Sequence, residues 1–301
     1  MHFGLTAPHF HQIASVEALQ RMAREAEAMG FDSLWVTDHI LLPTQYHERF
    51  GVPWLEMVPV LGYLAAVTRR LRLGTSVVIL PYRNPIFMAR ALATIDVLSG
   101  GRLLVGAAAG WCREEFAFLG VPFEERGNIS DEALRIFKAL WTEEEPRFEG
   151  KFWRFSGTRF EPKPIQKPHP PIFVGGNSRR ALRRAVELGD GWHPTRPTPE
   201  EVLGARPLLQ RLGERYGRRL EGFPIWVRHP LGVTDVPSGR YPLIGTVDSI
   251  RKGVEAFQRV GVTGFVLDTF YSVPEVGGAT LEGVLRTMEV FAQGVLPLYR
   301  G

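Results

Sequence analysis

Cysteine is almost missing from this chain of 301 residues: Cys112 is the only one. A lone cysteine can form no intrachain disulfide and no metal site built from several thiolates. Apolar runs of the ~20 residues that a membrane-spanning helix needs are missing as well. The first ten residues, MHFGLTAPHF, lack the basic and long apolar segments of a secretory leader. We therefore expect a soluble, cytoplasmic protein with no membrane partner.

Long runs of one charge are also missing. The 36 Lys and Arg residues nearly balance the 32 Asp and Glu residues, and the formal net charge is +4. The basic residues are scattered and interleaved with acidic ones, whereas nucleic-acid-binding proteins gather them on one face or along one helix. The charge pattern indicates a solvated surface, and no nucleic-acid partner is expected.

Hydrophobic residues make up 45% of the chain, and they come in short runs that alternate with amphipathic segments. The short runs predict strands, and apolar residues at helical spacing predict the helices between them. The predicted strands cover residues 2–7, 33–38, 71–80, 102–110, 172–176, 191–195, 223–233 and 263–270. The predicted helices cover residues 15–30, 54–68, 84–101, 112–142, 178–190, 198–216, 246–261 and 279–297.

Eight consecutive strand–helix units predict an α/β fold, a (β/α)8 TIM barrel that takes up residues 1–301 as one domain. The rival fold, an open doubly wound sheet, needs a glycine-rich turn after its first strand, and APHFHQ is not such a turn. The active site of a barrel lies at the C-terminal ends of its strands, so candidate residues are sought there.

One block breaks the alternation. Residues from about 142 to 171 are rich in proline and aromatic side chains, and they form too long a connection for an ordinary loop. We expect an ordered insertion between the fourth and fifth strands, with a hairpin around RFEGKFWRF.

Histidines and an acid at the strand ends raise the possibility of a metal site. His9 and His11 after the first strand, His193 after the sixth and Asp268 after the eighth are similar to the metal ligands of barrel amidohydrolases. Such a site also needs a histidine after the fifth strand and often a lysine from the fourth. This chain has VGGN at the fifth strand and no lysine in the fourth, so no metal is expected, and His9 and His11 are interpreted as a surface or substrate-lining pair.

A second interpretation is a ligand that carries a phosphate and a flat ring. In VGGNS, Gly175 and Gly176 permit close approach to the backbone just before a helix N-terminus, where anions bind. Asn177 or Ser178 can cap that helix and donate to a phosphate oxygen. The small residues at 106–110 leave room for a planar group. Ordinary capping and tight helix packing are the alternatives.

Five segments together resemble the bacterial luciferase-like family, and within it the branch that depends on coenzyme F420. They are GFDSLWVTDHI, LRLGTSVVILPYRNP, LSGGRLLVGAAAGWCREEFAFLGVPFEERG, PKPIQKPHPPIFVGG and ALRRAVELGDGW. The resemblance implies an oxidoreductase that transfers a hydride between F420 and a small organic substrate. An FMN-dependent monooxygenase that uses reduced flavin and oxygen is the alternative, and a noncatalytic flavin-binding protein is a third. The resemblance also implies a homodimer, with reduced cofactor supplied by a separate reductase.

The resemblance assigns roles to particular residues. His39 faces the hydride-bearing carbon and exchanges a proton with the substrate, although a purely structural role at the strand end is the other interpretation. Ser76 and Val77 form a bulge with a non-proline cis peptide behind the cofactor ring. The residues expected to bind the cofactor are Asp38, Ser76, Val77, Ala108, Gly110, Glu114, Gly175, Gly176, Asn177 and Ser178.

The chain departs from the sugar-phosphate-oxidising members of that branch at one position. Those members carry a glutamate after the glycine at the fourth strand, whereas this chain has Trp111. This difference favours an apolar or aromatic substrate, which we expect to contact His9, His11, Trp111 and His193.

Overall fold

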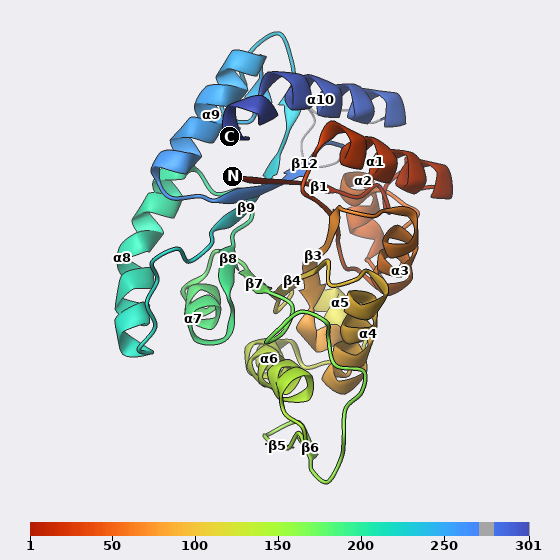
Figure 1. The fold of residues 1–301 in the computed structure, drawn as a ribbon, viewed down its shortest axis with the longest axis vertical. Coiled ribbons are helices and arrows are strands. Elements are labelled where there is room, and N and C mark those ends of the chain that lie inside the picture. Colours follow the sequence, from red (N-terminus) through yellow and green to blue (C-terminus); the bar gives the residue numbers. More distant parts are fainter. Residues whose placement is uncertain (271–279, 301) are drawn as a thin grey trace.

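The computed structural model describes residues 1–270 and 280–300. In that part of the chain, eight parallel strands form one sheet whose order follows the chain, and two short ladders lie outside it: one comes between β4 and β7 in the sequence and the other between β9 and β12 (Figure 1). The strands are β1 (His2–Thr6), β2 (Ser33–Val36), β3 (Arg72–Ile79), β4 (Leu103–Ala108), β7 (Ile172–Gly175), β8 (Gly191–His193), β9 (Trp226–Pro230) and β12 (Gly264–Asp268).

The two edges of this sheet meet, and the sheet becomes a barrel. β1 pairs with both β2 and β12, and β12 pairs with β9. Parallel bridges Trp192↔Ile225 and Thr195↔Arg228 join β8 to β9, the two strands at the ends of the order. The (β/α)8 barrel predicted from the alternation is therefore confirmed.

Helices surround the strands (Figure 1). The long ones are α1 (Val16–Met29), α3 (Met57–Val67), α4 (Pro85–Leu98), α6 (Arg126–Thr142), α7 (Arg179–Leu188), α8 (Pro199–Arg215), α9 (Val247–Arg259) and α10 (Leu281–Gly294). Local sequence sets several of their ends: Ser15 caps α1 by accepting from Ala18 N–H, and Gly30 ends the helix with φ at +83°. None of the helices in residues 1–270 and 280–300 has the length and apolar character needed to cross a membrane.

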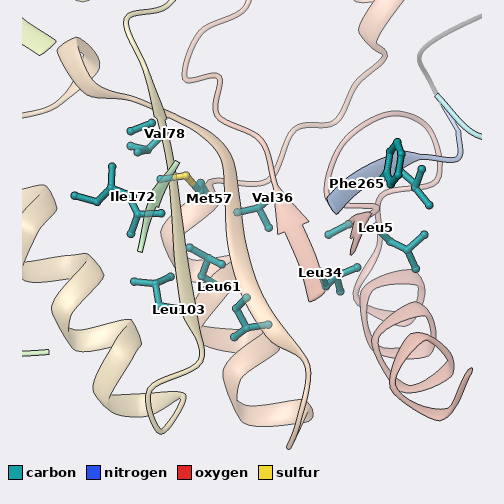
Figure 2. Packing of buried hydrophobic residues seen from close by; sticks show 14 of the residues in the cluster. Leu5, Leu34, Val36, Met57, Leu61, Val78, Leu103, Ile172 and Phe265 are labelled. Carbon is teal, nitrogen blue, oxygen red and sulfur yellow. The ribbon is translucent and has the colours of Figure 1, made fainter. Parts of the chain in front are cut away.

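Alternate residues of the strands face two different cores. Leu34 and Val36 of β2 belong to the core outside the barrel, which also contains Leu5 of β1 and Met57 and Leu61 of α3 (Figure 2). The residue between them, Trp35, points inward. It meets side chains of four other strands inside the barrel, where they form a second apolar cluster: Leu104, Phe173, Trp226 and Val266. The inward layer fills the barrel, so the space for a ligand lies above it.

The predicted insertion is present between α6 and β7. Its strands β5 (Phe148–Glu149) and β6 (Arg154–Phe155) pair as an antiparallel hairpin, as the sequence predicts. The hairpin projects away from the barrel beyond α6 (Figure 1).

Two predicted helices differ from the structure. The segment 112–142 is not one helix: α5 (Arg113–Phe118) ends before Gly120, whose φ is +67°, and α6 starts after Pro122. Both residues disfavour a continuous helix. The helix predicted from residue 54 begins at Met57, because Trp54 forms an isolated antiparallel bridge with Phe10 in the loop that follows β1.

Two further departures concern loops. A short helix, α2 (His47–Phe50), forms in the segment between β2 and α3, where none is predicted. The seventh predicted strand, residues 223–233, is shorter in the structure, where β9 ends at Pro230. Residues that follow it form β10 (Gly232–Val233), which pairs with β11 (Ile244–Gly245) in a separate ladder. The helix predicted for 279–297 is α10, and residue 279 lies outside the described residues.

Candidate active site

A cavity of about 510 Å³ opens at the C-terminal ends of the strands. The ends of β2, β3, β4 and β7 supply its floor through Asp38, His39, Val77, Ala108 and Gly175. In the sheet order, β3 and β4 separate β2 from β7. The cavity therefore extends across the rim from His39 on β2's side to the VGGNS segment on β7's side.

His39 is held by a buried glutamate from α5. Nδ1 of His39 lies 2.7 Å from Oε2 of Glu115, within hydrogen-bonding distance, and the side chain of Glu115 is fully buried. The hydroxyl of Tyr82 donates to the same oxygen at 2.9 Å, and the N–H groups of Ile40 and Leu41 donate to Oε1 at 2.5 and 3.0 Å. Burial alone would raise the pKa of Glu115, but these hydrogen bonds and the nearby His39 lower it below its ordinary value. Glu115 is therefore a carboxylate at neutral pH.

Aromatic rings gather around His39. Its imidazole lies 4.8 Å from the ring of Trp54, 5.8 Å from that of Trp111 and 6.0 Å from that of Phe50, measured between centroids. Tyr46 packs edge-on against Trp111 at 5.0 Å. We call Tyr46, Phe50, Trp54 and Trp111 the aromatic cluster. Trp111 is 47% exposed, so this side of the cavity has an apolar surface open to a ligand.

Asp38 does not present a free carboxylate to the cavity. Arg83 donates to both of its oxygens, at 2.7 and 2.8 Å, and Ile79 N–H donates to Oδ2 at 2.9 Å. The same arginine donates to Glu56 at 2.6 Å, and Glu56 caps the start of α3. The Asp38 carboxylate therefore fixes the end of β2 against the end of β3 and the start of α3, and so positions the adjacent His39.

The floor of the cavity contains the predicted non-proline cis peptide between Ser76 and Val77, which is confirmed. The Ser76 carbonyl accepts from Nη1 of Arg228 at 2.6 Å, and the Ser76 hydroxyl lies 2.8 Å from Nε2 of His193. Arg228 in turn is paired with the buried Asp268 at 3.1 Å. These contacts from β8, β9 and β12 hold the peptide from below.

Arginines dominate the side of the cavity near β7. Arg126, Arg180, Arg184 and Arg196 all line it, and we call them the arginine cluster. Asp131 pairs with Arg184 at 2.5 Å, but no carboxylate in the described residues pairs with the other three. These cations stand beside the N-terminus of α7, where the positive end of the helix dipole also favours an anion.

The VGGNS segment has the local structure that close approach of a ligand requires. Gly176 has φ at +113°, a conformation that residues with a side chain rarely adopt. Ser178 caps α7 by accepting from Ala181 N–H at 3.2 Å. The Asn177 side chain instead ties the segment to Thr195, accepting from its N–H at 3.0 Å and donating to its carbonyl at 2.9 Å. Capping and loop anchoring thus account for part of this motif.

The structure separates the predicted site residues into two groups. Those that line the cavity are Asp38, His39, Ser76, Val77, Ala108, Gly110, Trp111, Gly175, Gly176 and Ser178. Those that do not line it are His9, His11, Glu114, Asn177 and His193.

Physical reasons keep the second group out of the cavity. His9 is fully buried and hydrogen-bonds Ala7 and Thr37 backbone groups, and His193 is buried between Ser76 and the Trp226 carbonyl. Burial lowers the pKa of both rings to about 4, so they are neutral at neutral pH. Glu114 accepts from the side-chain amide of Gln45 at 2.8 Å.

His9, His11, His193 and Asp268 do not form a metal site together. No group of three or more His, Cys, Asp or Glu side chains in residues 1–270 and 280–300 is arranged to hold an ion. Asp268 is instead paired with Arg228, and Thr6 donates its hydroxyl proton to the same carboxylate.

Sequence reasoning missed Glu115 and the arginines. CREEF offers two adjacent glutamates, and only the direction of α5 decides which one reaches His39. The run SRRALRR signals a basic helix start, but not which arginines face the cavity. Arg126 and Arg196 come from other parts of the chain and carry no sequence signal of their own.

The chain belongs to the luciferase-like monooxygenase family, whose family model matches residues 1–240. It is similar to an uncharacterised protein of Mycobacterium tuberculosis, with 30% identity over 290 residues that cover 91% of this chain and 93% of the relative. It is also similar to an FMNH2-dependent dimethylsulfone monooxygenase of Pseudomonas putida, with 32% identity over 209 residues, 67% of this chain and 55% of that protein.

Solved structures share the fold. The monooxygenase RslO1 from Streptomyces bottropensis superposes with a TM-score of 0.83 at 23% identity, over the whole of both chains. An F420-dependent secondary alcohol dehydrogenase, in complex with an F420–acetone adduct, superposes with a TM-score of 0.84 at 18% identity, over 100% of this chain and 99% of that one. At these identities the likeness concerns the fold.

Proposed function

We propose that this protein is an oxidoreductase that transfers a hydride between coenzyme F420 and a small organic substrate. The observation that carries the proposal is one cavity with two different sides: a histidine–glutamate pair within aromatic rings on one, and arginines beside a helix N-terminus on the other. Such a cavity suits a cofactor that carries a flat ring and a phosphate, and places a proton-transfer group beside the substrate.

The charge of the lining favours F420 over FMN. Four lining arginines, Arg49, Arg126, Arg180 and Arg196, have no carboxylate partner within residues 1–270 and 280–300. The carboxylate that the lining does contain, on Asp38, is neutralised by Arg83. FMN ends in its phosphate, whereas the phosphate of F420 is followed by a chain of glutamate carboxylates. Several separated cations match the longer anion better.

The residues present fit such a cofactor. Gly176, Ser178 and the arginine cluster would hold the phosphate, and the Ser76–Val77 peptide and Ala108 would support the ring. The cofactor, when bound, supplies the hydride chemistry. His39 would hold or release the proton at its Nε2 atom, and the aromatic cluster would exclude water and orient a flat, apolar substrate.

An FMN-dependent monooxygenase is the second candidate. It is favoured by the 32% identity to a protein named as an FMNH2-dependent monooxygenase. In that case a separate reductase would supply the reduced flavin. His39 would still lie beside the substrate, among the rings of the aromatic cluster.

The proposal predicts which of the two cofactors binds more tightly. F420 should bind with a dissociation constant in the micromolar range or tighter, and FMN should bind more weakly, because FMN reaches fewer of the unpaired arginines. Isothermal titration with each cofactor measures this directly. Tighter binding of FMN would reverse the assignment and favour the monooxygenase.

Replacing one arginine should weaken cofactor binding without affecting the stability of the fold. Arg180→Gln removes a lining cation that has no ion pair, so F420 affinity should fall by about tenfold, the effect of losing one charged hydrogen bond. The melting temperature should stay unchanged. Arg179→Gln is the matched control, because Arg179 is the exposed neighbour on α7 and does not line the cavity. Equal F420 affinity in both variants would place the anion elsewhere.

A further inference from the structure

We propose that Glu115 is a positioning residue that fixes His39 in a single tautomer, with the proton on Nδ1 and with Nε2 free to exchange a proton with the substrate. The inference rests on the proposed function for its catalytic meaning, but the tautomer itself is a property of the protein alone.

The Glu115 carboxylate can only accept here. Each oxygen already accepts from another donor: the backbone N–H groups of Ile40 and Leu41 donate to Oε1, and the Tyr82 hydroxyl donates to Oε2, which Nδ1 of His39 also contacts. A backbone N–H cannot reverse its role, and its presence on Oε1 fixes the orientation of the carboxylate. The lowered pKa of Glu115 agrees with an ionised acceptor.

An accepting Glu115 decides where the proton of His39 lies. A neutral imidazole has one N–H and one bare nitrogen, and the partner of one nitrogen sets the state of the other. Because Nδ1 must donate to Glu115 at 2.7 Å, Nε2 carries the lone pair. Nε2 makes no hydrogen bond within residues 1–270 and 280–300, and His39 lines the cavity. The free lone pair therefore belongs to the substrate side.

Glu115→Gln should invert this arrangement. A glutamine keeps the shape, but its amide carries one accepting oxygen and one donating nitrogen. The oxygen must face the N–H groups of Ile40 and Leu41, since the amide nitrogen there would meet two donors. The amide nitrogen then faces Nδ1 of His39 and donates to it. The proton of His39 moves to Nε2, and the ring loses its free lone pair toward the cavity.

Nitrogen-15 NMR of histidine-labelled protein, without cofactor or substrate, tests the inference. The spectra are recorded at a pH at which the ring is neutral, and the His39 signals are assigned as those that disappear in His39→Ala. Wild type should show a protonated Nδ1 and a bare Nε2. Glu115→Gln should show the opposite pattern, whereas the exposed control Glu124→Gln and the milder variant Tyr82→Phe should keep the wild-type pattern.

Each outcome decides the question. A wild-type ring protonated on Nε2 overturns the proposal, even if Glu115→Gln does not fold. An unchanged tautomer in folded Glu115→Gln also overturns it, because a merely structural glutamate would leave the ring as it was. The variant should keep F420 affinity and lose turnover by about 10²-fold, in the range of general acid–base catalysis. If F420 does not bind wild type but the tautomer is as expected, the proposed function fails and the tautomer assignment stands.

Discussion

His39→Ala is expected to lower turnover by about 10²–10⁴-fold while F420 affinity stays nearly intact. The loss is the usual contribution of a general acid or base. Affinity should be spared because the residues expected to hold the cofactor, Gly176, Ser178 and the arginine cluster, come from β7 and neighbouring segments, whereas His39 comes from β2. The Asp38–Arg83 pair remains in the variant and keeps the end of β2 in place.

The assay begins with a screen of aromatic enones, quinones and alcohols, followed through the visible band of oxidised F420. The aromatic cluster around His39 is the reason to begin with flat, apolar compounds. Free imidazole should restore part of the turnover of His39→Ala, because the substitution leaves space at the base position. A variant that turns over at the wild-type rate would make His39 a structural residue at a strand end.

Acid should unfold this protein at an unusually high pH. Burial lowers the pKa of His9, His193 and His229 to about 4, and that of His2 to about 3, from an ordinary value of 6.5. Between these values the unfolded chain binds protons that the folded chain does not, so stability falls as the pH falls from 6.5 toward 4. Each histidine contributes up to about 1.4 kcal/mol per pH unit.

Four such residues together give a loss of up to about 5–6 kcal/mol per pH unit, against a typical unfolding free energy of about 5–15 kcal/mol. Urea unfolding at several pH values between 7 and 4.5 measures the slope. His229→Gln keeps a donor for the Pro230 carbonyl, which Nδ1 of His229 contacts at 2.9 Å, but cannot titrate. It should reduce the slope by about a quarter. A stability independent of pH across this window would show that the buried rings bind protons in the folded state.

The barrel could be predicted from the sequence because its signals are local. Short apolar runs mark the strands, and caps such as Ser15 and Gly30 mark the ends of α1. The break between α5 and α6 was missed because helical periodicity continues on both sides of Gly120 and Pro122. The short helix α2 has no periodic signal, since it is a single turn held within a loop.

The candidate site could be predicted only where strand ends supply it. Parallel strands of a barrel end at the same rim, so His39, Ser76 and Gly175 converge whatever the loops do. The positions of side chains beyond the strand ends depend on the direction of a helix or loop. The sequence therefore did not predict that Glu115 and Arg180 reach the site. The same dependence explains His9 and His193, which stand at strand ends but turn into the protein interior.

The central claim is that the cavity at the strand ends binds F420 between the arginine cluster and His39. A crystal structure of the protein with F420 tests it most directly. The account predicts the phosphate within hydrogen-bonding distance of the backbone at Gly176–Ser178, and the ring against the Ser76–Val77 peptide with its hydride-bearing carbon toward His39. Electron density for F420 outside this cavity, or with the ring directed away from His39, would contradict it.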